Sequence, residues 1–230
     1  MKKSLLILLT LFYLCETTSA FHIKGGFFTY QYLGPGTGSN LRYRITLTVY
    51  MQCNPNTGQL SNPINFSIFN AGNNQFVRDE SVSIANQYNL NKTFDEPCIT
   101  GDQRKCYYTI VVYDLASVEL PSTAAGYTIA YQRCCRIAGI NNVTSSDAVG
   151  NTFSINIPGT ATGLNAETNS SPVFLVNDTA VVCTSSFFQY SFKATDIDAG
   201  DSLSYEFCEA IQGANQNQST PATAANPPYS

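Results

Sequence analysis

The 230-residue sequence predicts an all-β protein made of antiparallel β-sandwich domains in tandem. Three observations lead to this fold class. Short segments of alternating polar and apolar residues recur along the chain, and turn-forming Gly, Pro and Asn separate them. Tyr and Phe are abundant at 14 each while Trp is absent, a composition that favours strands. No stretch shows the apolar spacing of an amphipathic helix.

The start of the chain has the layout of a secretory signal. Lys2 and Lys3 precede an apolar run at residues 5–14, and the small pair Ser19-Ala20 follows. A membrane anchor would need about twenty apolar residues, roughly twice the length of this run. We therefore expect residues 1–20 to be a signal peptide and the mature protein to be secreted or held at the outer cell surface.

The first strands form a hairpin. Residues 27–32 run into the turn-rich segment 34–38, and residues 41–50 then alternate polar with apolar side chains, so one face is buried. The further strand candidates are residues 64–69, 82–84, 106–113, 126–133, 153–157, 187–194 and 203–207. Many short strands at fairly even spacing predict immunoglobulin-like sandwiches.

A domain boundary is expected where this strand pattern stops. Pro158-Gly159-Thr160 and the polar residues 165–171 interrupt the pattern, and Pro172-Val173-Phe174 restarts it. We assign residues 21–164 to a first sandwich and residues 165–230 to a second. The second is truncated, because three clear strands cannot bury both faces of a sandwich. Its missing strands are expected beyond residue 230.

Seven cysteines follow the signal segment, and in an oxidising compartment they read as a disulfide framework. They are Cys53, Cys98, Cys106, Cys134, Cys135, Cys183 and Cys208. The expected disulfides are Cys98 with Cys106, Cys183 with Cys208, and Cys53 with either Cys134 or Cys135. One cysteine is then left over, and the spacings match no zinc ribbon or knuckle.

Charge and residue content argue against several function classes. A net charge of −4 with 12% charged residues leaves neither a nucleic-acid footprint nor a polybasic membrane patch. The single histidine, His22, would be the second residue of the mature chain, and a catalytic triad is hard to hold at a terminus. The acid pairs Asp79-Glu80 and Asp95-Glu96 could serve a glycosidase, but solvated loop acids are the simpler interpretation. Nothing downstream of the signal segment is apolar enough to be a transmembrane segment.

Tyrosines offer a possible sugar-stacking platform. Tyr107, Tyr108 and Tyr113 lie in one predicted strand. Aromatic residues in such strands more often fill the core or form cross-strand pairs.

Several motifs resemble the amino-terminal region of large secreted surface proteins of Bacteroidetes. The matching residues are 22–26, 49–53 and above all 126–136, with its run Tyr131-Gln132-Arg133-Cys134-Cys135-Arg136. Residues 194–205 are similar to a motif of cadherin-like bacterial domains. The resemblance implies cell-surface location, immunoglobulin-like and cadherin-like repeats, and a carboxy-terminal gliding-motility or type IX sorting domain. At Met51-Gln52 the chain departs from the Arg-Asp pair usual in that family.

A calcium site is expected in the second domain. Asp196, Asp198 and Asp201 present three carboxylates within six residues, and Gly200 supplies a flexible turn. The spacing excludes an EF-hand, because Phe207 stands where the bidentate Glu belongs. An acidic turn that caps the strand pair is the alternative.

Two short motifs, around Thr179 and Ser202, resemble the Asp-Ser/Thr-apolar acceptor sites for O-linked sugars in the same bacterial group. They predict glycosylation at these two residues.

Together these patterns predict a non-catalytic module that acts in adhesion, ligand binding or domain display. The expected partners are an extracellular glycan, protein or matrix ligand and further domains of the same chain. The alternative is a set of accessory β-domains of a secreted hydrolase whose catalytic domain lies beyond residue 230.

Overall fold

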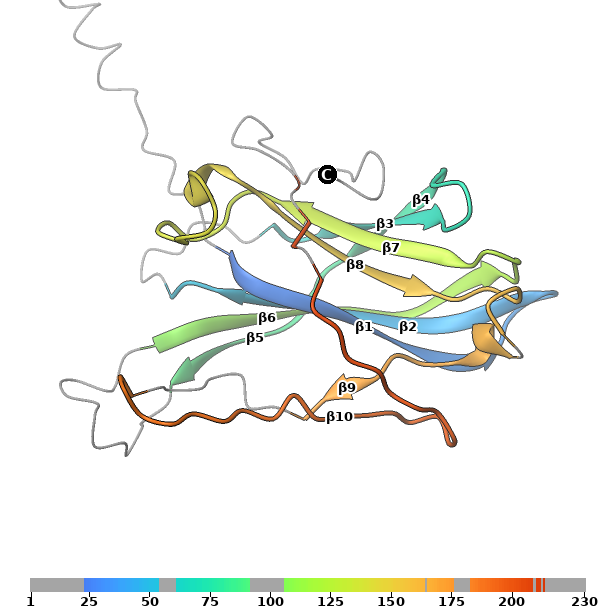
Figure 1. Ribbon diagram of the computed structural model, residues 1–230. Helices are drawn as coiled ribbons and strands as arrows, with labels where there is room; N and C mark the ends of the chain where they lie inside the picture. Colours follow the sequence, from blue (N-terminus) through green and yellow to red (C-terminus); the bar gives the residue numbers. More distant parts are fainter. Residues whose placement is uncertain are drawn as a thin grey trace, which may run out of the picture.

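The protein is an all-β sandwich of two four-stranded antiparallel sheets, as seen in the computed structural model of the chain (Figure 1). The structure describes residues 23–53, 61–91, 106–163, 165–175, 183–208, 210–211 and 213, with residues 106 and 107 described by their backbone alone. Within these ranges the helical structure consists of two single-turn 3-10 helices, η1 (Ser146–Ala148) and η2 (Ala166–Thr168).

The first sheet, called sheet A, contains strands from both halves of the sandwich sequence. Its members are β1 (Ile23–Pro35), β2 (Asn40–Met51), β5 (Ile84–Asn91) and β6 (Cys106–Pro121). Their spatial order is β1-β2-β6-β5, which leaves β1 and β5 at the edges. The hairpin predicted at the start of the chain is the β1-β2 pair, with Tyr30 opposite Ile45.

The second sheet, sheet B, covers the inner face of sheet A. It contains β3 (Ile64–Asn70), β4 (Phe76–Val82), β7 (Tyr127–Arg133) and β8 (Asn151–Ile157) in the order β4-β3-β7-β8. The chain crosses between the sheets after β2, β4 and β6. The edge strands β1 and β8 contact each other and lie on the same side of the sandwich, as Figure 1 shows.

The core lies between the sheets and follows from the period of two in the strands. Every second residue of β2 from Tyr43 to Met51 is buried, while the intervening residues are exposed or half-buried. Phe28 and Phe66 meet edge to face across the sheets, with ring centroids 5.0 Å apart. The largest fully buried side chains include Phe66, Ile45, Leu47, Ile68, Leu120 and Ile129.

The sequence predicts one short strand at residues 82–84, but two strands meet there. β4 ends at Val82 and β5 begins at Ile84, with Ser83 between them. Their sequences carry charged residues in β4 and amides in β5, and most of their side chains are half-buried or exposed. β5 is an edge strand of sheet A and β4 an edge strand of sheet B. Polar edge strands lack the apolar alternation that marks a buried face.

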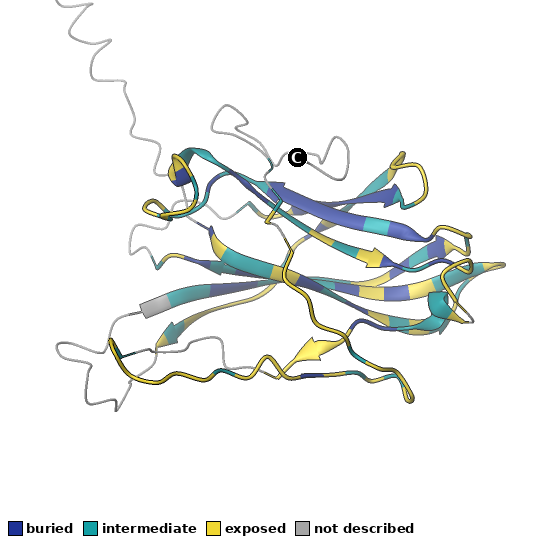
Figure 2. Cartoon of the chain, in the orientation of Figure 1, coloured by how far each residue is buried: buried dark blue, intermediate teal, exposed yellow. Residues whose placement is uncertain are grey.

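The second half of the chain holds less regular structure than predicted. Of the segment 187–194, only Ala194 is in a strand, and residues 203–207 form none. The strands found there are β9 (Val173–Phe174) and β10 (Ala194–Thr195), which pair with each other in a small separate sheet. Figure 2 shows that this part is largely exposed.

The predicted boundary is a docking point on β1. Ser170 and Ser171 are buried against this edge strand. The backbone N–H of Tyr30 donates to Ser171 Oγ at 2.9 Å, and that of Tyr32 donates to Ser170 Oγ at 3.2 Å. The N–H of Ser171 in turn donates to the Tyr30 carbonyl at 2.9 Å. The two serines thus satisfy backbone groups of β1 that have no neighbouring strand.

Two further hydrogen bonds hold the same junction. The Tyr43 hydroxyl donates to the Glu167 carbonyl at 2.6 Å, and the Ser170 N–H donates to Asp198 Oδ2, also at 2.6 Å. Residues 167–171 are therefore fixed to sheet A, and Asp198 is linked to them through Ser170.

Beyond this junction the chain crosses to sheet B (Figure 1). The Ile211 carbonyl accepts hydrogen bonds from the Thr152 N–H of β8 and from Arg136 Nη2, at 3.3 and 3.2 Å. Gly213 lies directly against the side chains of Thr152 and Gln132, and a Cβ there would collide with both. We call Ala210, Ile211 and Gly213 the strap.

The serine junction predicts a measurable stability effect. Ser171→Ala removes the acceptor for the buried N–H of Tyr30, so the free energy of unfolding should fall by about 1 to 3 kcal/mol. Urea denaturation measures this change. Ser154→Ala, on the exposed face of β8, is the matched control and should stay within about 0.5 kcal/mol of the parent. Equal midpoints for the two variants would show that the junction adds no stability.

Candidate functional site

A pocket lies where the junction meets the outer face of sheet A. Its volume is about 430 Å³, within the roughly 300 to 1,000 Å³ typical of small-molecule sites. We call it the junction pocket. Its lining residues are Thr29, Tyr30, Gln31, Arg44, Thr46, Ser170, Ser171, Val173, Thr195, Asp196 and Ile197.

Strand alternation places the polar groups on the sheet side of the junction pocket. Thr29 and Gln31 flank the buried Tyr30 in β1, so both point to the outer face. Arg44 and Thr46 flank Ile45 in β2 in the same way. The other wall comes from the docked segment, which contributes Ser170, Ser171 and residues around β10.

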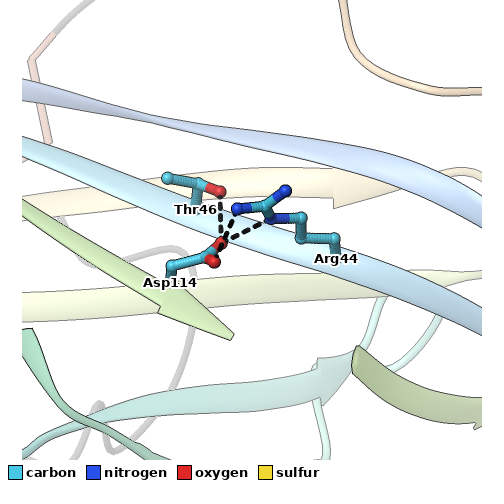
Figure 3. Close-up of polar contacts among 3 residues, drawn as sticks. All are labelled: Arg44, Thr46 and Asp114. Atoms are coloured by element: carbon cyan, nitrogen blue, oxygen red, sulfur yellow. Dashed lines mark hydrogen bonds and ion pairs between the residues drawn. The ribbon is translucent and has the colours of Figure 1, made fainter. Parts of the chain in front are cut away.

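An ion pair fixes the arginine of this pocket (Figure 3). Arg44 Nε donates to Asp114 Oδ1 at 2.8 Å and Nη2 donates to Oδ2 at 2.7 Å, a two-point contact that sets the guanidinium plane. The Thr46 hydroxyl donates to the same carboxylate at 2.9 Å. The Arg44 side chain remains 51% exposed, whereas that of Asp114 is 14% exposed. Hydrogen bonding from Arg44 is the main cause that lowers the pKa of Asp114, and the bond from Thr46 adds to it.

The three predicted metal ligands lie together beside the pocket. Carboxylate oxygens of Asp196, Asp198 and Asp201 all lie within 4.8 Å of one another. Asp196 Oδ1 accepts the Asp198 N–H at 2.9 Å, and Asp198 Oδ2 accepts the Ser170 N–H. Gly200 has φ +98°, a conformation that favours glycine, so the chain can turn and bring Asp201 back toward the other two.

The acidic trio acts electrostatically on its neighbour in β1. Burial, followed by the negative charges of Asp196, Asp198 and Asp201, raises the pKa of Tyr30 to about 12. The trio is therefore close enough to sheet A for its charge to be felt at the pocket.

The cysteine pairing differs from the expected one. Cys134 and Cys135 are bonded to each other, which leaves neither sulfur available to Cys53. Cys53 and Cys183 are each disulfide-bonded. Cys208, expected to pair with Cys183, is instead exposed with a free thiol. Cys98 and the side chain of Cys106 lie outside the described residues, so their pairing stays a prediction.

Other predicted site residues are placed as follows. Tyr113 lies in the core, whereas Tyr108 is on the outer face of sheet A with its ring 5.9 Å from that of Tyr50. Ser202 is exposed. The signal segment, His22, Asp95-Glu96, Thr179 and the Tyr107 side chain lie outside the part of the chain that the structure describes.

The acid pair in β4 has structural contacts. Asp79 accepts a hydrogen bond from the Ser67 hydroxyl at 2.6 Å, and Glu80 pairs with Arg78 at 2.7 Å. Both carboxylates therefore stabilise sheet B in this structure.

Sequence reasoning did not find the junction pocket. Arg44 and Thr46 stand at polar positions of an alternating strand, which by itself indicates only a solvated face. A stronger signal is Asp114, a single acid after the apolar run of β6, because a half-buried carboxylate needs a charged partner. The partner comes from a strand 70 residues earlier.

The comparisons with known proteins give no relative. The chain matches no protein-family model, no curated protein and no solved structure. Among the described residues, none of the helical segments has the length and apolar character needed to cross a bilayer.

The ion pair predicts the titration of Asp114. Its pKa should lie below the ordinary value of about 3.9, and Arg44→Gln should raise it, because the charged donor is removed. A carboxylate with a depressed pKa stabilises the fold above its unfolded pKa, and that contribution disappears as pH falls through the folded pKa. Carboxyl-detected NMR titration checks both points. An unchanged pKa in Arg44→Gln would mean that the pair is not formed in solution.

Proposed function

We propose that this chain is a non-catalytic module of an exported cell-surface protein, acting in adhesion, ligand binding or domain display. The observation that carries the proposal is the disulfide bonding of Cys53, Cys134, Cys135 and Cys183. Such bonds persist in oxidising compartments outside the cytosol. The signal-like residues 1–20 and the motifs that resemble those of Bacteroidetes surface proteins support the same location.

The scaffold suits display and binding. An antiparallel sandwich with a continuous core is a rigid support, and its outer faces and loops are free to carry ligand contacts. The junction pocket offers such a contact site on the outer face of sheet A.

The region after the junction exposes apolar side chains that a partner with further β-structure would cover. Phe174, Phe187, Phe192 and Phe207 are more than half exposed, a large apolar surface for a soluble protein. We propose that residues 165–230 belong to a second β-unit, and that further domains of the same chain or a bound partner cover this surface.

Export is tested by following the chain in a producing cell with an oxidising periplasm. The expected product begins at Phe21, lies outside the cytoplasm and has Cys208 open to alkylation while Cys53 and Cys183 are protected. Amino-terminal sequencing and mass mapping without reductant measure this. Ala20→Arg places a large residue at the cleavage site and should block processing. An unprocessed parent chain, retained in the cytoplasm with reduced thiols, would contradict the proposal.

Calcium binding by the acidic trio is a further part of this proposal. Three convergent carboxylates offer the hard oxygen ligands that Ca²⁺ takes, and affinities of extracellular modules are on the order of 10⁻⁴ to 10⁻³ M. Asp198 also holds the junction through Ser170, so its substitution would mix folding with binding. Asp201 is exposed, which makes it the cleaner position to change.

Calorimetric titration with millimolar CaCl₂ tests the site. Asp201→Asn should weaken calcium binding at least several-fold, because one anionic ligand becomes neutral at constant shape. Glu206→Gln, an exposed acid on the same segment, is the matched control and should bind like the parent. No heat in the parent, or the same isotherm in both variants, would assign the trio to the structure of the turn alone.

A further inference from the structure

The junction pocket presents hydrogen-bond donors and acceptors together. Gln31 carries both an amide N–H₂ and a carbonyl, and Thr29 and Thr195 add hydroxyl groups that can act either way. The Thr46 hydroxyl donates to Asp114, so toward a ligand it acts as an acceptor. Asp196 adds acceptor oxygens from the opposite wall. A ligand that fits must therefore offer several groups that both donate and accept.

The charge distribution argues against a strongly charged ligand. The Arg44 charge is balanced by the two-point contact with Asp114, and the acidic trio lies next to the pocket. An anion would meet these carboxylates with no unpaired cation to compensate among the residues that line the pocket. A cationic ligand would compete with the Ca²⁺ proposed for the same carboxylates. A neutral polar ligand meets neither obstacle.

Arg44 can still contribute to such a ligand. Asp114 uses Nε and Nη2, and Figure 3 shows the third guanidinium nitrogen pointing away from these contacts. Because the plane is already fixed, this nitrogen can donate to a ligand oxygen with little loss of side-chain entropy.

The pocket lining also has an apolar part. Val173 and Ile197 belong to it and are 49% and 69% exposed. Exposed aliphatic side chains gain from covering by C–H surface, while the hydroxyl and amide groups of the same lining need polar partners. A sugar ring has this combination, with C–H groups on its faces and hydroxyl groups around its edge.

We infer that the junction pocket binds a neutral oligosaccharide, with Gln31, Arg44 and Thr195 contacting ligand hydroxyls. This inference rests on the proposed function and deepens it by naming a ligand class and a site. Both walls are required, because Thr195 and Asp196 reach the pocket only when Ser170 and Ser171 are docked on β1.

The test is a glycan array of neutral, sulfated and sialylated oligosaccharides probed with the purified protein, followed by calorimetric titration of the best neutral sugar. The parent should bind neutral sugars selectively. Gln31→Ala should weaken binding at least tenfold, since it removes both a donor and an acceptor, and Thr195→Ala should weaken it several-fold. Gln31 and Thr195 are exposed, so neither change should alter the unfolding midpoint.

Asn86→Ala is the matched control, because this exposed amide lies on β5 at the far edge of sheet A. It should bind as the parent does. Binding only to acidic sugars, binding that Gln31→Ala leaves unchanged, or no binding to any neutral sugar would overturn the inference. If the protein is exported and disulfide-bonded but binds no sugar, the inference fails while the proposed surface module stands.

Discussion

The contact of Ser170 and Ser171 with β1 is the interaction on which the candidate sites depend. β1 is an edge strand of sheet A. It pairs with β2 along one edge, so the N–H and C=O groups along its other edge need other partners. The two serines provide them through side-chain oxygens and one backbone N–H. This docking places the next residues of the chain over the outer face of sheet A. The junction pocket and the acidic trio both exist because of that placement.

The sandwich itself could be predicted from sequence because strand alternation and turn residues are local features of the chain. The alternation in β2 specifies a buried face, and polar turns separate the strands. β4 and β5 were missed for a related reason. As edge strands they bury little, and Arg78, Asp79 and Glu80 in β4 resemble a charged loop when read alone. Their strand structure comes from pairing with β3 and β6, which a local pattern does not contain.

The candidate sites also divide into those with a local sequence signal and those made by residues far apart in the chain. The acidic trio was visible because its three residues lie within six positions and a glycine turn joins them. The Arg44-Asp114 pair joins residues 70 positions apart, and the serine contacts with Tyr30 span 141. The bond between Cys134 and Cys135 was also missed, because one of these adjacent cysteines was expected to pair with Cys53 and the other to be left over. Contacts between residues that only the strand topology brings together cannot be predicted from their spacing in the sequence.

The strap contacts a second edge strand, β8 of sheet B, on the same side of the molecule as β1. The Ile211 carbonyl accepts from the Thr152 N–H, so the outer strand of sheet B also has a backbone partner from the later part of the chain. A single downstream segment thus occupies β1 through its serines and β8 through its strap. An unpaired strand edge is the usual template for edge-to-edge aggregation. Where copies of the protein stand close together, these contacts at β1 and β8 would hinder neighbouring sandwiches from pairing through the same two edges as a continuous sheet.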